Sequence, residues 1–146
     1  MISSSPPRPY VLDSFALLAY LGDEAGADRV SAILDDADIG RCRLFMSAVN
    51  LGEVAYIVER ERGGARAEEA LDQIGRLPLS IRDATHQLCL RAAHVKAQFP
   101  IAYADCFAVA LAQELGAAVV TGDPEFEKVE ALVPVEWLPR AQGTST

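Results

Sequence analysis

A chain of 146 residues with 51% hydrophobic and 23% charged residues has the size and composition of a single globular domain. Its formal net charge of −8 argues against a protein that holds nucleic acid through a broad basic surface, because such binding rests on neutralising phosphates. Residues 1–9 lack the apolar run of a secretory signal, and no apolar stretch reaches the length of a membrane span. Three widely spaced cysteines without a Cys-x-x-Cys pair suggest neither a disulfide framework nor a zinc site.

These features predict a soluble cytoplasmic protein with one folded domain over residues 10–139. We expect residues 1–9, which are rich in serine and proline, to form a flexible segment, and residues 140–146 to form a flexible tail. The sequence contains no repeat at a fixed period, so any function must come from the folded body.

The first half of the chain alternates short apolar runs with helical spacing. Tyr10-Val11-Leu12 favours a strand that stops at Asp13, after which Ser14 is expected to cap an apolar helix. In chain order, the expected elements are a strand at 10–12, helices at 14–21 and 24–37, a strand at 44–46 and a longer helix that begins at Ser47.

The second half continues the alternation. The glycine pair at 63–64 and the Phe99-Pro100 step separate its helices. The expected elements are a helix at 66–76, a strand at 79–81, a helix at 84–98, an apolar helix that contains residues 103–111, a buried strand at 117–120 and a short strand at 135–137. Strands that alternate with helices predict an α/β fold with a parallel sheet, in which ligands bind at the carboxyl ends of the strands.

Four acidic residues stand at the ends of these elements. Asp13 and Asp123 follow predicted strands, whereas Glu53 and Asp105 lie early in helices that bury apolar neighbours. An ionised acid beside a core needs a partner, and a hard divalent cation such as Mg²⁺ or Mn²⁺ favours carboxylate oxygens. Four such acids in one place suit metal-assisted phosphodiester hydrolysis.

Each acid also has a purely structural interpretation. Asp13 or Asp123 could be only a turn former or a helix cap, and Asp105 could be a solvated first-turn acid favoured by the helix dipole. Glu53 could be one end of a surface ion pair with Arg60 or Arg43. The joint pattern at four element ends, rather than any single residue, favours a common site.

Four segments resemble the PIN domains, a family of ribonucleases, in order and in spacing. They are residues 10–18, 47–54, 102–112 and 120–126, which together extend over most of the chain. The length and single-domain form are most similar to the VapC-like toxins of bacterial type II toxin–antitoxin pairs. The resemblance implies a three-layer α/β/α sandwich around a parallel sheet of about five strands and a metal-dependent endoribonuclease.

The same resemblance implies roles for individual residues. Asp13, Glu53 and Asp105 would hold Mg²⁺ or Mn²⁺, and Asp123 would bind a second ion or orient the attacking water. The residues expected to support these carboxylates are Ser14, Asn50 and Thr121. The implied partners are an RNA substrate, a cognate antitoxin and a second copy of the chain, with no membrane. Gly122 stands where other residues also occur in the family.

Other functions have weaker support. A catalytically silent PIN-like module that binds RNA or protein would share the fold, but all four acids are present. A phospho-acceptor receiver domain needs a lysine beyond a late strand, and neither Lys96 nor Lys128 is suitably placed. No glycine-rich phosphate-binding run follows any strand. His86 and His94 are eight positions apart on one predicted helix, about 12 Å, which is too far to share a metal.

Three further features have both a functional and a structural interpretation. Arg60, Arg62 and Arg66 could contact RNA phosphates, but a solvated helix face is the more common explanation. The aromatic residues Phe45, Tyr56 and Trp137 are expected in the core or an interface rather than under RNA bases. The helix over residues 14–21 is apolar on nearly every side, which predicts a surface for the antitoxin or a second copy.

Overall fold

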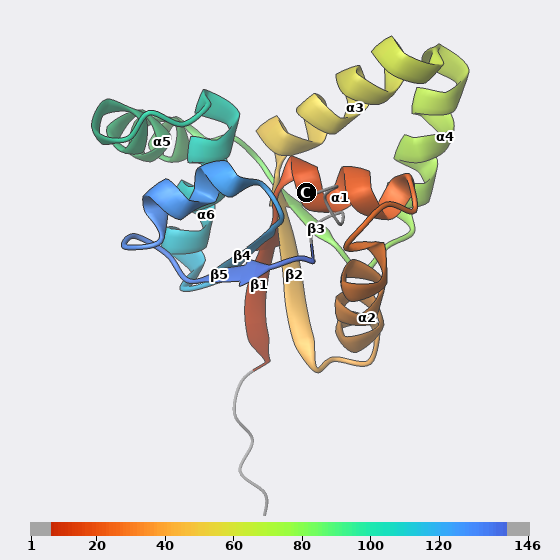
Figure 1. The fold of residues 1–146 in the computed structure, drawn as a ribbon, viewed down its shortest axis with the longest axis horizontal. Helices are drawn as coiled ribbons and strands as arrows, with labels where there is room; N and C mark the ends of the chain where they lie inside the picture. The colour runs from red at the N-terminus through yellow and green to blue at the C-terminus, as the bar shows by residue number, and fades with distance from the viewer. Residues whose placement is uncertain (1–6, 140–146) are drawn as a thin grey trace, which may run out of the picture.

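The computed structural model describes residues 7–139, which form a parallel sheet covered by helices on both faces (Figure 1). The five strands have the order β3-β2-β1-β4-β5. Their bounds are β1 Arg8–Leu12, β2 Cys42–Ser47, β3 Ser80–Arg82, β4 Ala118–Thr121 and β5 Val135–Trp137. The prediction of a three-layer α/β fold with about five parallel strands is confirmed.

The register of the three central strands brings their carboxyl ends to one level. Val11 of β1 pairs with Phe45 of β2 on one side and with Val119 of β4 on the other. Two positions further along, Asp13 therefore stands between Ser47 and Thr121. The backbone N–H of Asp13 still donates to the carbonyl of Val120 at 3.3 Å, so the first acid is held directly at the edge of the sheet.

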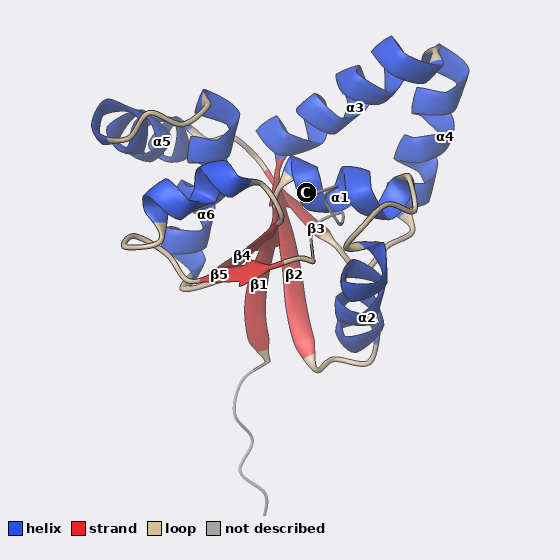
Figure 2. Ribbon diagram, in the orientation of Figure 1, coloured by secondary structure: helices blue, strands red, loops and turns tan. Residues whose placement is uncertain are grey.

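The helices divide between the two faces of the sheet, as Figure 2 shows. One face is covered by α1 Ser14–Leu21, α2 Ala27–Asp38, α3 Ala48–Arg62 and α4 Gly64–Gly75, and the other by α5 His86–Gln98, α6 Tyr103–Leu115 and the 3₁₀ helix η1 Pro124–Val129. Adjacent residues of β1 serve different cores, because Leu12 packs with Leu17 and Met46 whereas Val11 packs with Val109. This period-2 alternation is what a sheet buried on both faces requires.

The helices and strands predicted from the sequence are present, with some different boundaries. β1 begins at Arg8, inside the segment expected to be flexible, because Arg8 and Pro9 pair with Cys42 and Arg43 of β2. α2 begins at Ala27 rather than near residue 24, since Gly26 adopts φ 93° before it. η1 was not expected, because a six-residue 3₁₀ helix leaves no apolar period in the sequence. The expectations for residues 1–6 and 140–146 lie outside the described residues.

The cap of α1 also differs from the prediction. Asp13, not Ser14, is the N-cap, and its Oδ1 accepts a hydrogen bond from the backbone N–H of Ala16 at 2.9 Å. Ser14 is the first residue of the helix, and its hydroxyl donates instead to Glu53 on α3. The sequence pattern Asp13-Ser14 permits either residue as the cap, and the tertiary contact decides between them.

Two properties bear on the environment of the chain. Cys42, Cys89 and Cys106 are free thiols. In the described part of the chain, no single helix is long and apolar enough to cross a membrane, and α5 and α6 reach that length only together across a 116° bend.

Candidate metal centre

Asp13 is the most deeply buried acid of the described chain, with 1% of its surface exposed. Its two carboxylate oxygens have separate partners: Oδ1 accepts from the Ala16 N–H, and Oδ2 accepts from the Thr121 hydroxyl at 2.5 Å. Burial raises the pKa of Asp13 to about 8, although these two hydrogen bonds lower it, and repulsion from Asp105 and Asp123 raises it further. The fold therefore holds a carboxyl group where ionisation is costly.

Thr121 connects Asp13 with Asp123. Its buried hydroxyl donates to Asp13 and accepts from the backbone N–H of Asp123 at 3.0 Å. The Oδ1 of Asp123 accepts from the Glu125 N–H at 2.9 Å and so caps η1. Asp13 and Asp123 are thus both helix caps, as the structural interpretation expects. They also follow the neighbouring strands β1 and β4, so they lie at the same end of the sheet.

Glu53 reaches the same region from α3. Its Oε1 accepts a hydrogen bond from the Ser14 hydroxyl at 2.5 Å, which places it beside the first turn of α1. The ion pair with Arg60 or Arg43 is absent from the described residues. The Arg60 guanidinium lies 5.1 Å from the Tyr56 ring centre instead, and that of Arg43 lies 5.0 Å from the Phe45 ring centre. The interpretation of Glu53 as half of a surface ion pair is therefore wrong.

Asn50 connects the three helices that carry the acids. Its Nδ2 donates to the carbonyl of Ala104 at 3.1 Å, directly before Asp105, and to the Ser14 hydroxyl at 3.3 Å. Asn50 is fully buried, and its Oδ1 has no hydrogen-bond partner among residues 7–139. A buried carbonyl oxygen without a donor normally contacts a water or a ligand, so this network has one acceptor left to satisfy.

Asp105 lies in the first turn of α6 and is half-buried. Burial raises its pKa to about 7, and repulsion from Asp123, Glu53 and Glu125 adds to the increase. Asp105 is thus the first-turn acid that the structural interpretation expects, but it is half-buried rather than solvated. Glu125 is an acid near the cluster that the sequence analysis missed, because it follows Asp123-Pro124 inside η1 rather than ending a strand.

The structure thus brings the four predicted acids to one end of the sheet, where they repel one another. As they stand, no three acidic, histidine or cysteine side chains in the described chain are arranged to hold a metal ion. Three of the four carboxylates accept hydrogen bonds: Asp13 from Ala16 and Thr121, Glu53 from Ser14, and Asp123 from Glu125. A carboxylate oxygen that accepts one hydrogen bond keeps a lone pair with which it can bind an ion. The donor set still fits Mg²⁺ or Mn²⁺, since both ions prefer carboxylate oxygens and no basic side chain neutralises Asp13 or Asp105 in residues 7–139.

A family model for the PIN domain matches residues 10–132. The chain belongs to the PIN-domain family. All four acids, and also Ser14, Asn50 and Thr121, lie within the matched residues. Among curated protein sequences, none is significantly similar to this PIN domain.

Solved structures of VapC and VapBC proteins share the fold of this PIN domain. A chain of VapBC2 from Rickettsia felis, bound to a promoter DNA fragment, has a TM-score of 0.72 at 18% identity, over 89% of this chain and 98% of that one. VapC20 from Mycobacterium tuberculosis, a toxin that cleaves the sarcin-ricin loop, has a TM-score of 0.68 at 19% identity, over 87% and 98%. VapBC-1 from nontypeable Haemophilus influenzae gives 0.65 at 21%, over 88% and 98%.

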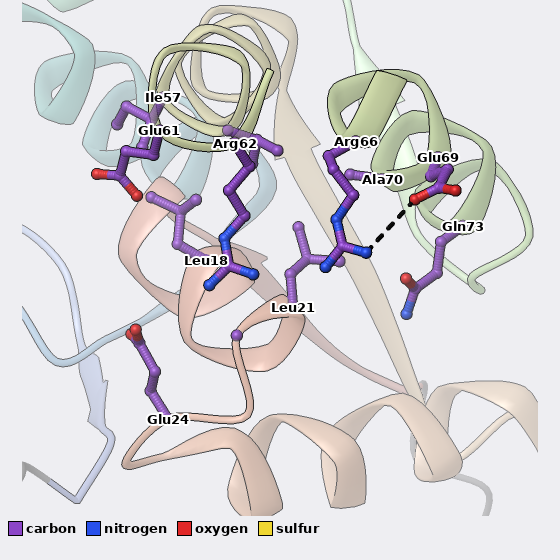
Figure 3. A pocket seen from close by; sticks show the side chains of 12 residues that line it. Leu18, Leu21, Glu24, Ile57, Glu61, Arg62, Arg66, Glu69, Ala70 and Gln73 are labelled. Atoms are coloured by element: carbon purple, nitrogen blue, oxygen red, sulfur yellow. Dashed lines mark ion pairs between the residues drawn. The ribbon is translucent and has the colours of Figure 1, made fainter. Parts of the chain in front are cut away.

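A pocket of about 360 Å³ lies between α1, α3 and α4 of this PIN domain (Figure 3). None of the four acids of the candidate metal centre lines it. Leu18 and Leu21 of α1 form its apolar floor together with Ile57 and Val58 of α3. Arg62 points into the pocket, as does Arg66, which also pairs with Glu69 at 3.7 Å. Part of the apolar surface of α1 that the sequence predicts to bind a partner therefore lines a pocket that also has charged side chains.

The remaining candidates lie elsewhere. His86 and His94 are exposed on α5. Phe45 is buried in the core at 4% exposure, and Trp137 donates from its ring N–H to Glu130 at 2.8 Å. Both agree with the expectation that these aromatic residues are structural. Tyr56, in contrast, is 49% exposed, so it does not lie in the core.

Proposed function

We propose that this PIN domain is a Mg²⁺- or Mn²⁺-dependent endoribonuclease that acts as the toxin of a toxin–antitoxin pair. One observation carries the nuclease proposal. Asp13, at the end of β1, and Asp105, in the first turn of α6, have pKa values raised to about 8 and about 7, and no cation of the described chain neutralises them. Perturbed carboxyls gathered at the carboxyl ends of parallel strands are typical of a functional site.

Asp13, Glu53 and Asp105 would hold the ion, and Asp123 would hold a second ion or orient the attacking water by a hydrogen bond. When bound, such an ion stabilises charge that develops on the phosphate and makes water a better nucleophile. A bound cation would also remove the repulsion that now raises the pKa of Asp105.

The three supporting residues would fix the carboxylates in place. Thr121 orients Asp13 through its hydroxyl and Asp123 through the backbone N–H. Ser14 orients Glu53, and Asn50 holds the chain directly before Asp105. Groups that orient metal ligands in this way contribute strongly to metal affinity and activity.

The toxin role rests on family and fold. Structures that share the fold include VapBC from Salmonella typhimurium bound to DNA and a toxin–antitoxin complex from Klebsiella pneumoniae. We propose that the pocket between α1, α3 and α4 receives a segment of the antitoxin, because apolar Leu18 and Leu21 are half-buried there beside the charged Arg62. The homodimer remains a prediction.

The proposed nuclease is tested by incubating the purified chain with single-stranded RNA in Mg²⁺, in Mn²⁺ and in EDTA. Cleavage that needs the metal and is lost in Asp13→Asn and Asp105→Asn is the expected result. RNA that stays intact in millimolar Mn²⁺ would refute the nuclease and favour a catalytically silent binding module.

A further inference from the structure

Phe15 is an aromatic residue that belongs to neither core. Its side chain is 38% exposed, whereas its neighbours Ser14 and Ala16 are buried. It is absent from both groups of apolar residues that pack on the two faces of the sheet. At 38% exposure, Phe15 gains less from the hydrophobic effect than a fully buried phenylalanine, and the exposed part of its side chain is free to contact a ligand.

The ring is held against the backbone of Gly122. A Cβ atom at Gly122 would lie 2.5 Å from Cε1 of Phe15, 3.0 Å from Cζ and 3.2 Å from Cδ1. Gly122 is not among the glycines with positive φ, so the backbone conformation there does not require glycine. A side chain at residue 122 would instead force the Phe15 ring to move, because the edge of that ring occupies the space of a Cβ atom.

This contact lies inside the candidate metal centre. Phe15 is two residues after Asp13, and Gly122 stands between Thr121, which donates to Asp13, and Asp123. Ser14, directly before Phe15, donates to Glu53. Figure 1 shows the beginning of α1 beside the beginning of α3, above the ends of the central strands. One edge of the ring thus lies against Gly122, next to Thr121 and Asp123, and the exposed part of the side chain faces solvent.

We propose that Phe15 is a stacking platform for an unpaired RNA base beside the phosphate that is cut, an inference that rests on the proposed nuclease function. Every base has a π-face, so an aromatic platform binds single-stranded RNA with little dependence on sequence. Such binding suits a chain of net charge −8, which cannot rely on a broad basic surface. The Gly122 contact restricts one edge of the ring, so less side-chain freedom is lost when a base stacks on it than on a ring without such a contact.

Another exposed aromatic residue, Tyr103, provides a control. Tyr103 is 45% exposed and stands two residues before Asp105, but it points about 200° around α6 from that acid. Its ring packs edge-on against Phe107, with the centres 5.0 Å apart. Tyr103→Leu therefore removes an exposed ring near the site in sequence without removing the platform on Gly122.

The test measures binding of an unstructured 12-nucleotide RNA and of a series in which each base in turn is made abasic. Phe15→Leu and Tyr103→Leu are compared with their parent, all carrying Asp105→Asn so that the RNA is not cut. One abasic position is expected to weaken the parent by about 5- to 150-fold, the range measured for one stacked base. Phe15→Leu should weaken binding of intact RNA by a similar factor, and in this variant the loss of the same base should have no further effect. Tyr103→Leu should change neither the affinity for intact RNA nor the effect of the abasic position.

Equal weakening of intact and abasic RNA by Phe15→Leu would mean a merely structural role and would overturn the inference. The inference would also be overturned if the parent bound RNA with the same affinity whichever base was made abasic. This measurement does not depend on whether the Phe15→Leu variant folds. Cleavage by the chain with Asp105 intact is measured in parallel. If the chain with Asp105 intact cuts RNA but Phe15→Leu weakens intact and abasic RNA equally, or no abasic position matters, only the stacking inference is refuted. If the chain with Asp105 intact does not cut RNA, the proposed nuclease function is refuted as well.

Discussion

Acidic residues at the carboxyl end of the sheet and acidic residues on the rest of the surface are treated differently by this fold. On the surface, some acids pair with basic side chains: Glu136 pairs with Arg29 at 3.1 Å, and Glu69 pairs with Arg66 at 3.7 Å. At the carboxyl end, Asp13 and Asp105 meet hydrogen-bond donors or other acids, and their pKa values rise. In residues 7–139, ion pairs therefore occur on the surface and at Glu125, which pairs with Lys128 at 3.3 Å, but not at Asp13 or Asp105.

This difference has a cost in stability. Burying carboxyl groups together without a counter-ion disfavours the folded state, and natural proteins keep such arrangements where function needs them. The contrast therefore supports our proposal that the acids at the carboxyl end bind a ligand that the chain does not supply. A hard divalent cation has the required charge and ligand preference.

The largest expected effect comes from removing one acid of the cluster. Asp105→Asn should reduce RNA cleavage by at least about 100-fold, since losing a ligand should exceed the loss from an orienting partner. The same change should raise the melting temperature of the metal-free protein by a few degrees, because a repelled, half-buried charge disappears. The matched control is Asp36→Asn on α2, which removes only a surface pair with Arg41 at 4.0 Å and should alter neither quantity.

A smaller effect is expected from Thr121→Val, which keeps the volume and removes the hydroxyl that serves Asp13 and Asp123. Metal affinity or activity should fall by about 10- to 100-fold. Thr85→Val is the control, because the Thr85 hydroxyl caps α5 by accepting from the Leu88 N–H at 3.1 Å. That variant should lose about 1 kcal/mol of stability and keep full activity. Equal activities of the two variants would remove Thr121 from the account.

The pH dependence of stability sharpens the comparison further. The folded pKa values of Asp13 and Asp105, about 8 and about 7, lie above the ordinary value of 3.8. The folded protein therefore binds more protons than the unfolded chain between these limits, and these acids make the metal-free protein lose stability as the pH rises from about 4 to about 8. Mn²⁺ should raise the melting temperature more at pH 8 than at pH 5.5. An equal rise in melting temperature at both pH values would contradict the claim that the ionisation of Asp13 and Asp105 causes the metal effect.

The smallest effect is expected on the surface. Glu136 and Arg29 are partly exposed, with 31% and 40% of their side chains accessible, so Glu136→Gln should change the free energy of unfolding by less than about 1 kcal/mol. Chemical denaturation in the presence and absence of Mn²⁺ should give the same small difference. A difference that depends on the metal would mean that the two regions are coupled.

Much of this fold can be predicted from local patterns. Asp13 and Asp123 follow apolar runs, and the rule that parallel strands end at one edge brings them together before any coordinates are known. The PIN-domain resemblance is confirmed by the match over residues 10–132. That these acids hold a metal stays a prediction.

Other features depend on contacts between distant residues. The choice of Asp13 over Ser14 as the cap of α1 follows from the bond between Ser14 and Glu53, which no local pattern contains. The contact of Phe15 with Gly122 joins α1 to the residue after β4, and glycine alone gives no sign of what fills its space. Glu125 was missed because a short 3₁₀ helix brings it back toward Asp105.

The central claim, that the acids at the carboxyl end are left for a divalent cation, is tested most directly by calorimetric titration of the purified chain with Mn²⁺ at pH 7.5. Two buffers of different ionisation enthalpy report the protons released. We predict binding that releases protons, because Asp13 and Asp105 must ionise to hold the ion, and loss of that binding in Asp105→Asn. The absence of any Mn²⁺ binding at millimolar concentration, or equal binding by Asp105→Asn, would contradict the account.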